Sequence, residues 1–166
     1  MTENRTASAP PKIIIERRYR ARVEELWDLW TTKAGFESWW GPQGFRVEVR
    51  ALEAKVGGQL RYAMIADAPE MVAAMKAQGQ PLSTEISTHF SELQPYQRLA
   101  ITSVMDFLPG VAAYDNTIAV EFHPDGDHVR MRVALEPLHT EDFSKMQQAG
   151  FTSQLGKLDQ RYGVDA

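Results

Sequence analysis

The sequence contains no cysteine, which excludes disulfides, thiol nucleophiles and thiolate metal sites. It also lacks an apolar run near the roughly 18 residues that a membrane-spanning helix needs, and it has no apolar N-terminal stretch typical of a signal peptide. Acidic residues outnumber basic ones, 22 to 18, for a net charge of −4. That balance argues against nucleic-acid binding through phosphate neutralisation. The lack of cysteine fits a reducing compartment, so we expect a cytoplasmic protein.

Sequence patterns of common catalytic and metal-binding sites are missing as well. There is no Gly-x-Ser-x-Gly nucleophile motif, no zinc-binding helix motif and no EF-hand loop. The pair Gly57-Gly58 lacks the lysine and the helix that follow a phosphate-binding loop. His123 and His128 flank the turn of residues 124–127, and a solvated hairpin tip is a simpler interpretation of that pattern than a metal site. We therefore expect no cofactor and no metal.

The composition of the chain is that of an ordinary globular protein. Hydrophobic residues make up 43% and charged residues 24% of its 166 residues, a length typical of one domain. Residues 1–11 are polar and end in Pro10-Pro11, which indicates a disordered tail. We expect a single domain over residues 12–166.

The hydrophobic pattern changes period along this domain. Residues 13–20 have the composition of a strand, and apolar residues from Val23 to Trp30 have helical spacing. After an interruption at residues 33–35, residues 36–40 predict a second short helical turn. Alternation then predicts strands within residues 44–51, 60–64, 86–93, 99–107, 118–122 and 129–135, with a short helix over 69–80. After Thr140, a long helix would line up Phe143, Met146, Gly150, Phe151, Leu155, Leu158 and Tyr162 on one side.

This order of elements predicts the fold. Short turns between strands imply antiparallel neighbours. A twisted sheet with one apolar face must cover that face, and the long helix is large enough to do so. We therefore predict an α+β fold, in which a curved antiparallel sheet of about six to seven strands grips a long C-terminal helix, with two short helices after the first strand.

Several segments resemble a known family. The most specific is LWDLWT at residues 26–31, followed by FESWWGP at 36–42. Weaker matches are RRYRA at 17–21, VGGQLRY at 56–62, QPYQRL at 94–99, and Gly150-Phe151 with Leu155 and Leu158. Together they resemble the activator of heat-shock-protein-90 ATPase homologue-like family, within the SRPBCC superfamily of START-related and Bet v 1-like helix-grip domains. The resemblance runs over residues 13–162.

The resemblance implies a helix-grip fold with a cavity between the sheet and the long helix. It leaves the activity open, because the superfamily includes lipid carriers, hormone receptors and cyclases. The chain departs from the usual family pattern at Arg22, where the family usually has proline, and at Phe151, where it usually has tryptophan. Residues 67–80 are longer and more helical than usual, which would reshape the entrance to the cavity.

The candidate ligand-binding residues combine inward strand positions with the aromatic segment and the long helix. They are Trp39, Tyr62, Met64, Met105, Phe122, Met131, Met146, Gly150 and Phe151. For the four tryptophans, core packing and an aromatic wall that a ligand touches both remain open. Gly150 either lets the helix approach the sheet closely or leaves room for a ligand. No residue is assigned a catalytic role.

The leading functional hypothesis is the binding of an apolar small molecule in the implied cavity, without clear catalytic activity. One alternative is a stress- or chaperone-related protein-interaction module, with an exposed apolar patch at Trp39-Trp40 or at Met71 and Met75. The same methionine pair favours a homodimer contact. A second alternative is a cyclase- or hydrolase-like enzyme that uses the cavity. Its candidate ionisable groups, which no spacing gathers, are Glu85, His89, Asp106 and Asp115.

Overall fold

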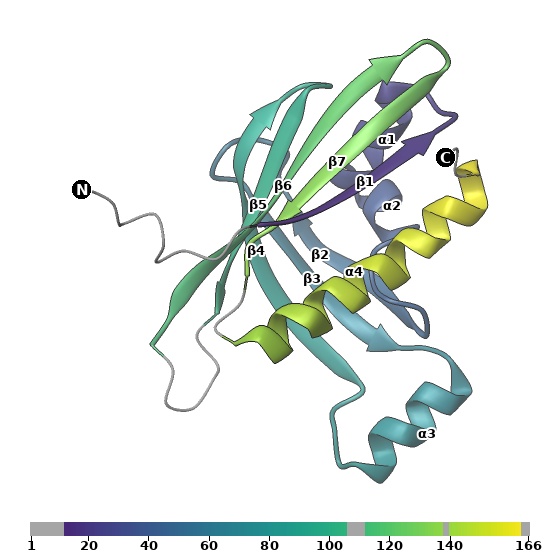
Figure 1. Cartoon of the computed structure of the whole chain (residues 1–166). Helices are drawn as coiled ribbons and strands as arrows, with labels where there is room; N and C mark the ends of the chain where they lie inside the picture. Colours follow the sequence, from purple (N-terminus) through teal and green to yellow (C-terminus); the bar gives the residue numbers. More distant parts are fainter. Residues whose placement is uncertain (1–11, 106–111, 138–139, 164–166) are drawn as a thin grey trace.

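The computed structural model describes residues 12–105, 112–137 and 140–163, so the expected tail over residues 1–11 lies outside the described part. Figure 1 shows one curved sheet with a long helix across its concave side. The elements in chain order are β1 (Ile13–Tyr19), α1 (Val23–Thr31), α2 (Lys33–Glu37), β2 (Phe45–Leu52), β3 (Gln59–Ala66), α3 (Pro69–Ala77), β4 (Ser83–Gln94), β5 (Arg98–Met105), β6 (Tyr114–Asp125), β7 (His128–Leu135) and α4 (Glu141–Tyr162).

The sheet has seven strands in the order β1-β7-β6-β5-β4-β3-β2, and each neighbouring pair is antiparallel. The first strand therefore pairs with the last one, while β2 to β7 follow each other in the sheet in chain order, with α3 in the connection between β3 and β4. Apolar side chains alternate onto the concave face, as Leu60 on β3, Leu99 on β5 and Val133 on β7 show. The predicted α+β helix-grip arrangement is confirmed.

The two short helices differ in detail from the sequence-based expectation. Residues 33–35 do not separate them as an interruption, because α2 itself begins at Lys33 and is capped by Thr32, whose Oγ1 accepts a hydrogen bond from Gly35 N at 3.0 Å. The helix ends at Glu37, so Trp39 and Trp40 lie in the turn after it. Both indoles are nevertheless buried, because tertiary contacts and not helical spacing place them in the interior.

The long helix begins where the sequence predicts, but part of its expected inner face is wrong. Thr140 Oγ1 accepts a hydrogen bond from Phe143 N at 3.2 Å, which is a typical N-cap. Met146 is 66% exposed and Phe143 38% exposed, so neither is buried against the sheet. The buried positions of α4 are Ser144, Phe151, Gln154, Leu155 and Leu158.

The second half of α4 is bonded to β1 by a partly buried polar contact. The Tyr19 hydroxyl donates to Asp159 Oδ1 at 2.6 Å, and Arg17 Nε donates to the same oxygen at 3.3 Å. Burial, together with the neighbouring carboxylate, raises the pKa of Tyr19 well above its usual value. Arg17 is thus the inward arginine of β1, and Asp159 is its partner.

The other side of the same helix half is held by the connection between α2 and β2. Lys157 Nζ donates to the Phe45 carbonyl at 3.2 Å, and Ser153 Oγ accepts from Gln43 N at 2.9 Å. One turn further on, Arg161 donates to the Ser38 carbonyl at 3.2 Å. The second half of α4 is therefore clamped from two sides.

The remaining arginines of β1 and its extension face outward, as their alternation predicts. Arg18 pairs with Asp125 at 3.3 Å, and Arg20 pairs with Asp127 at 2.7 Å. All four side chains are well exposed, so each pair contributes little to stability. Arg18 and Arg20 are therefore paired, on the outer face, with carboxylates of the β6–β7 hairpin.

The contact between Tyr19 and Asp159 predicts a specific alkaline destabilisation. The folded protein keeps the phenol proton at a pH where the unfolded chain, with an ordinary value of 10.0, releases it. The contribution of Tyr19 is therefore complete below that pH and is lost as the pH rises beyond it. Tyr19→Phe should lower the free energy of unfolding near neutral pH by about 1–3 kcal/mol. It should also make stability fall less steeply between about pH 9 and about pH 11.

Urea unfolding at these pH values measures both effects. Tyr96→Phe, at an exposed position, is the matched control and should leave the alkaline slope unchanged. An unchanged slope in the Tyr19 variant would contradict the role assigned to this contact.

Alanine substitutions at two glycines should change the stability of the fold in opposite directions. A Cβ at Gly58 would lie 2.1 Å from the Glu53 carbonyl oxygen, whereas a Cβ at Gly150 in α4 would meet no atom within 4 Å. Gly58→Ala should therefore destabilise the fold by about 1–3 kcal/mol through backbone displacement. Gly150→Ala should stabilise it by up to about 1 kcal/mol, because alanine is the better helix former. Thermal unfolding of both variants checks the pair, and destabilisation by Gly150→Ala would show that the space beside it is filled.

Candidate functional site

A dense aromatic cluster fills one part of the interior between α4 and the sheet. Its members are Trp30, Phe36, Trp39, Trp40 and Phe151, with ring centroids between 4.6 and 6.3 Å apart. Each is at most 5% exposed. Edge-to-face pairs dominate, which is the favourable geometry for aromatic side chains. Core packing is therefore what the structure shows for these three tryptophans, and Trp39-Trp40 is not an exposed patch.

Polar atoms within this cluster are mostly paired. Trp39 Nε1 donates to the Leu29 carbonyl at 2.9 Å, and Trp40 Nε1 donates to the Tyr62 hydroxyl at 3.0 Å. Burial raises the pKa of Tyr62 to about 12, so the phenol stays neutral. Trp30 Nε1 is buried and has no hydrogen-bond partner among the described residues. The cluster is thus a neutral, tightly packed wall, to which Tyr62 contributes the hydroxyl.

Other expected site residues also belong to the packed part. Met131 is fully buried on β7, and Phe122 on β6 is 3% exposed and contacts Trp27 edge to face at 5.8 Å. Met105 is the last residue of β5, and its side chain lies outside the described part of the structure. A ligand therefore cannot reach Phe122 or Met131 without displacing core side chains.

A less tightly covered region lies on the inner face of the four strands β3 to β6. Met64, Ile86 and Ile118 are apolar but only half-buried, and Ser103 lies in the same region. The strand register makes them neighbours, because Ile86 pairs with Tyr62 next to Met64, and Ile118 pairs with Ile101 next to Ser103. These side chains are less completely covered than the core residues of the same strands.

One flank of α4 faces this region. Phe143, Met146, Gly150 and Lys157 fall at helical spacing along a single stripe. Lys157 bonds to the Phe45 carbonyl at the start of β2, so the stripe faces the β2–β3 side of the sheet. Gly150 is half-buried, and a side chain there would meet open space. Of the expected site residues, Met146 and Gly150 therefore lie on this stripe of α4, and Met64 lies on the inner face of β3.

Two glutamines on the inner side of α4 were not expected from the sequence. Gln154 is 4% exposed, and its Oε1 accepts from Gly41 N at 3.0 Å while its Nε2 is buried without a partner among the described residues. Gln147 Nε2 donates to Asn116 Oδ1 at 3.2 Å, while the Gln147 Oε1 is buried and likewise unpartnered. Leaving such a group unpaired costs roughly 1–3 kcal/mol.

The signal that could have revealed these glutamines is their spacing. They lie seven residues apart and flank Gly150, which places them on the same side of the helix. Polar residues on a helix usually face solvent, so the pattern alone favoured an outer position. Asn116, a buried polar residue on the inner face of β6, accepts from Gln147 Nε2 and donates to the Glu136 carbonyl, both at 3.2 Å.

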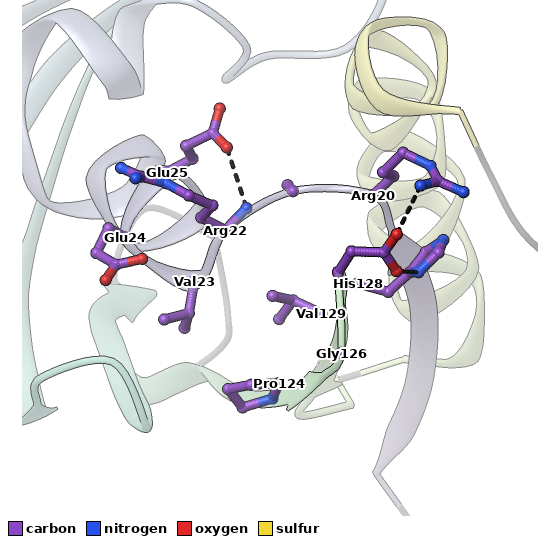
Figure 2. A pocket seen from close by; sticks show the side chains of 11 residues that line it. Arg20, Arg22, Val23, Glu24, Glu25, Pro124, Gly126, His128 and Val129 are labelled. Atoms are coloured by element: carbon purple, nitrogen blue, oxygen red, sulfur yellow. Dashed lines mark hydrogen bonds and ion pairs between the residues drawn. The ribbon is translucent and has the colours of Figure 1, made fainter.

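A hollow of about 450 Å³ lies elsewhere, between the β1–α1 junction and the β6–β7 hairpin (Figure 2). Its lining includes Arg20, Glu24, Glu25 and the Asp127 carboxylate, over the apolar side chain of Val129. Asp127 is already bound to Arg20 at 2.7 Å and to His128 Nδ1 at 2.7 Å. This hollow beside the β6–β7 hairpin is not the cavity that the sequence-based hypothesis places under the long helix.

The ionisable groups considered for catalysis do not converge. Glu85 pairs with Arg50 at 3.2 Å, and the register places Glu85, His89 and Asp115 on the outer face of the sheet. Asp106 lies outside the described residues. Within the described ranges there is no group of three or more His, Asp or Glu side chains that could hold a metal ion.

The insertion between β3 and β4 forms α3, which is shorter than the predicted helix over residues 69–80. Figure 1 shows it projecting beyond the ends of these strands. Met71 packs against Gly44, while Met71, Val72 and Met75 are all half-buried. No helix in the described ranges is both long and apolar enough to cross a membrane.

Comparison with solved structures finds the same fold in bacterial proteins. A protein of Chromobacterium violaceum superposes with a TM-score of 0.71 at 19% identity, over 94% of this chain and 100% of that one. The AHSA1 protein of Silicibacter pomeroyi gives 0.69 at 19% identity over 90% and 96%. A protein of Arthrobacter aurescens gives 0.70 at 17% identity over 95% and 87%. At these identities the likeness shows the fold alone.

Sequence comparison is more specific about the family. A search of curated proteins finds no significant match. The sequence profile of the family described as activator of Hsp90 ATPase homolog 1-like protein matches residues 20–163, which is most of the chain. The chain therefore belongs to the activator of Hsp90 ATPase homolog 1-like family, within the SRPBCC superfamily.

Proposed function

We propose that this protein binds an apolar small molecule between the first half of α4 and the inner face of strands β3 to β6. The observation that carries the proposal is the open space beside Gly150, taken together with the half-buried apolar side chains of Met64 and Ile118 on the inner face of the sheet. Removing an apolar ligand from water here would contribute roughly 0.8 kcal/mol per buried CH₂ group.

The division of the interior supports the same conclusion. The aromatic cluster and the clamped second half of α4 form a rigid end, because their side chains are buried and paired. The first half has exposed apolar side chains at Phe143 and Met146 and a glycine at its inner flank. A ligand would therefore enter at the first half and stop against the aromatic cluster.

The proposed ligand-binding residues follow from this placement. Tyr62 and Phe151 would form the closed end, and Met64 and Gly150 would form the walls. Met146 would lie at the mouth, where an adaptable side chain suits varied apolar ligands. Trp39, Phe122 and Met131 would support these residues as core and would not contact the ligand.

A protein-interaction role is the second candidate, favoured by the exposed side chain of Met146 next to Phe143. The half-buried methionines of α3 would supply a homodimer contact in that case. An enzymatic role has less support, because Glu85, His89 and Asp115 lie on the outer face. The lack of cysteine, which suits a reducing compartment, supports a cytoplasmic location as part of the proposal.

The space beside Gly150 predicts a blocking substitution. Gly150→Leu would place a side chain in the proposed site, so it should weaken the binding of the neutral fluorescent probe N-phenyl-1-naphthylamine by at least about tenfold, or about 1.4 kcal/mol. Fluorescence titration measures the affinity, and thermal unfolding checks that the variant is folded. Ala149→Leu is the matched control, because Ala149 is the neighbouring residue on the exposed side of α4.

Other outcomes would contradict the proposed site and favour the protein-interaction role. If wild-type protein does not bind the probe, or if both leucine variants bind it as wild type does, the proposed site is wrong. Loss of binding in both variants would place the site on the outer surface of α4 instead.

A further inference from the structure

We infer that the molecule bound under α4 is neutral and carries a hydrogen-bond acceptor toward the aromatic cluster and a donor toward the mouth, as in a hydroxyketone. Gln154 would bind the acceptor and Gln147 the donor. This inference rests on the proposed function and adds the chemical class of the ligand to it.

Gln154 determines the acceptor end. Its Oε1 is occupied by Gly41 N at 3.0 Å, so the orientation of the amide is settled, and Nε2 is the atom left without a partner among the described residues. An NH₂ group only donates, and it therefore requires an acceptor such as a carbonyl oxygen. The residue is 4% exposed, so its amide is shielded from bulk solvent.

Gln147 determines the donor end of the ligand, because its unpartnered atom is an acceptor and not a donor. Its Nε2 donates to Asn116 Oδ1 at 3.2 Å, and the Asn116 amide in turn donates to the Glu136 carbonyl at 3.2 Å. This chain leaves Gln147 Oε1, which is buried and unpartnered among the described residues. A carbonyl oxygen only accepts, so a ligand hydroxyl or N–H would satisfy it.

The spacing of the two residues sets the length of the ligand. Seven residues of an α-helix correspond to a rise of about 10 Å. Gly150 lies between the two glutamines and leaves its inner flank free of a side chain. An apolar chain that runs along the helix past Gly150 would bring one polar group to each glutamine.

The charges around this path favour a neutral ligand. Arg17, on the inner face of β1, is paired with Asp159, which also accepts from Tyr19. Lys157 donates to the Phe45 carbonyl, and burial lowers its pKa. An ionised carboxylate at Gln154 would lose its hydration without gaining an uncommitted cation from these groups.

Four medium-chain probes that compete with N-phenyl-1-naphthylamine test the inference on the full chain. They are an ω-hydroxy methyl ketone, the methyl ketone without the hydroxyl, the alcohol without the ketone, and the ω-hydroxy acid. We expect the hydroxyketone to bind about threefold to tenfold more tightly than either single-group probe, the contribution of one neutral hydrogen bond. The hydroxy acid should bind more weakly at neutral pH.

Substitutions at the two glutamines separate specific contacts from a general effect on the fold. Gln154→Met should remove the preference for the ketone and keep that for the alcohol, and Gln147→Met should do the reverse. Gln148→Met, on the exposed side of α4, is the control and should change neither. If Gln154→Met does not fold, Gln154→Glu keeps an oxygen for Gly41 N and replaces the amide donor.

The outcomes distinguish this inference from the proposed function. Probes that bind equally well whatever their polar groups would refute the glutamine contacts and leave apolar binding intact. A hydroxy acid that binds most tightly would refute neutrality. If none of the probes, including N-phenyl-1-naphthylamine, binds wild-type protein, the proposed function fails and the inference fails with it.

Discussion

The hydrogen bond between Tyr19 and Asp159 joins β1, one edge strand of the sheet, to the second half of α4. On the opposite side, Lys157 and Ser153 bind the connection that leads into β2. Because β1 and β2 are the two edge strands of the sheet, these bonds join both edges to one helix segment. The curvature of the sheet around α4 depends on that double attachment, which apolar packing alone would not orient.

The double attachment divides the interior into two environments. Beneath the clamped half, indole and phenyl rings pack edge to face and exclude a guest. Toward the other half, the inner faces of β3 to β6 have half-buried apolar side chains. Gly150 has no side chain that could cover them. A rigid wall next to an incompletely filled region is the arrangement that small-molecule sites generally use. Membership of the family is consistent with this arrangement but does not identify a ligand.

The outer face of the sheet has a different role. Its arginines alternate with carboxylates, so that Arg98, for example, contacts Glu121 at 2.7 Å and Glu92 at 3.1 Å. Such exposed pairs contribute little stability individually. On the inner side of α4, by contrast, the side-chain atoms left without a hydrogen-bond partner among the described residues include the neutral amides of Gln147 and Gln154. This separation explains why the ionisable residues considered for catalysis do not lie at the candidate site.

The amino-acid sequence by itself determined the order of elements, the antiparallel sheet and the start of α4 after Thr140, because these follow from local periodicity and capping. The inward strand positions at Leu60, Tyr62 and Val133 also followed from simple alternation. Only the tertiary structure decided which side of α4 faces the sheet. Its rotation is set by distant partners, Tyr19 and Gly41, which bind Asp159 and Gln154. That rotation exposes Met146 and buries Gln154, against the usual preference of polar helix residues for solvent.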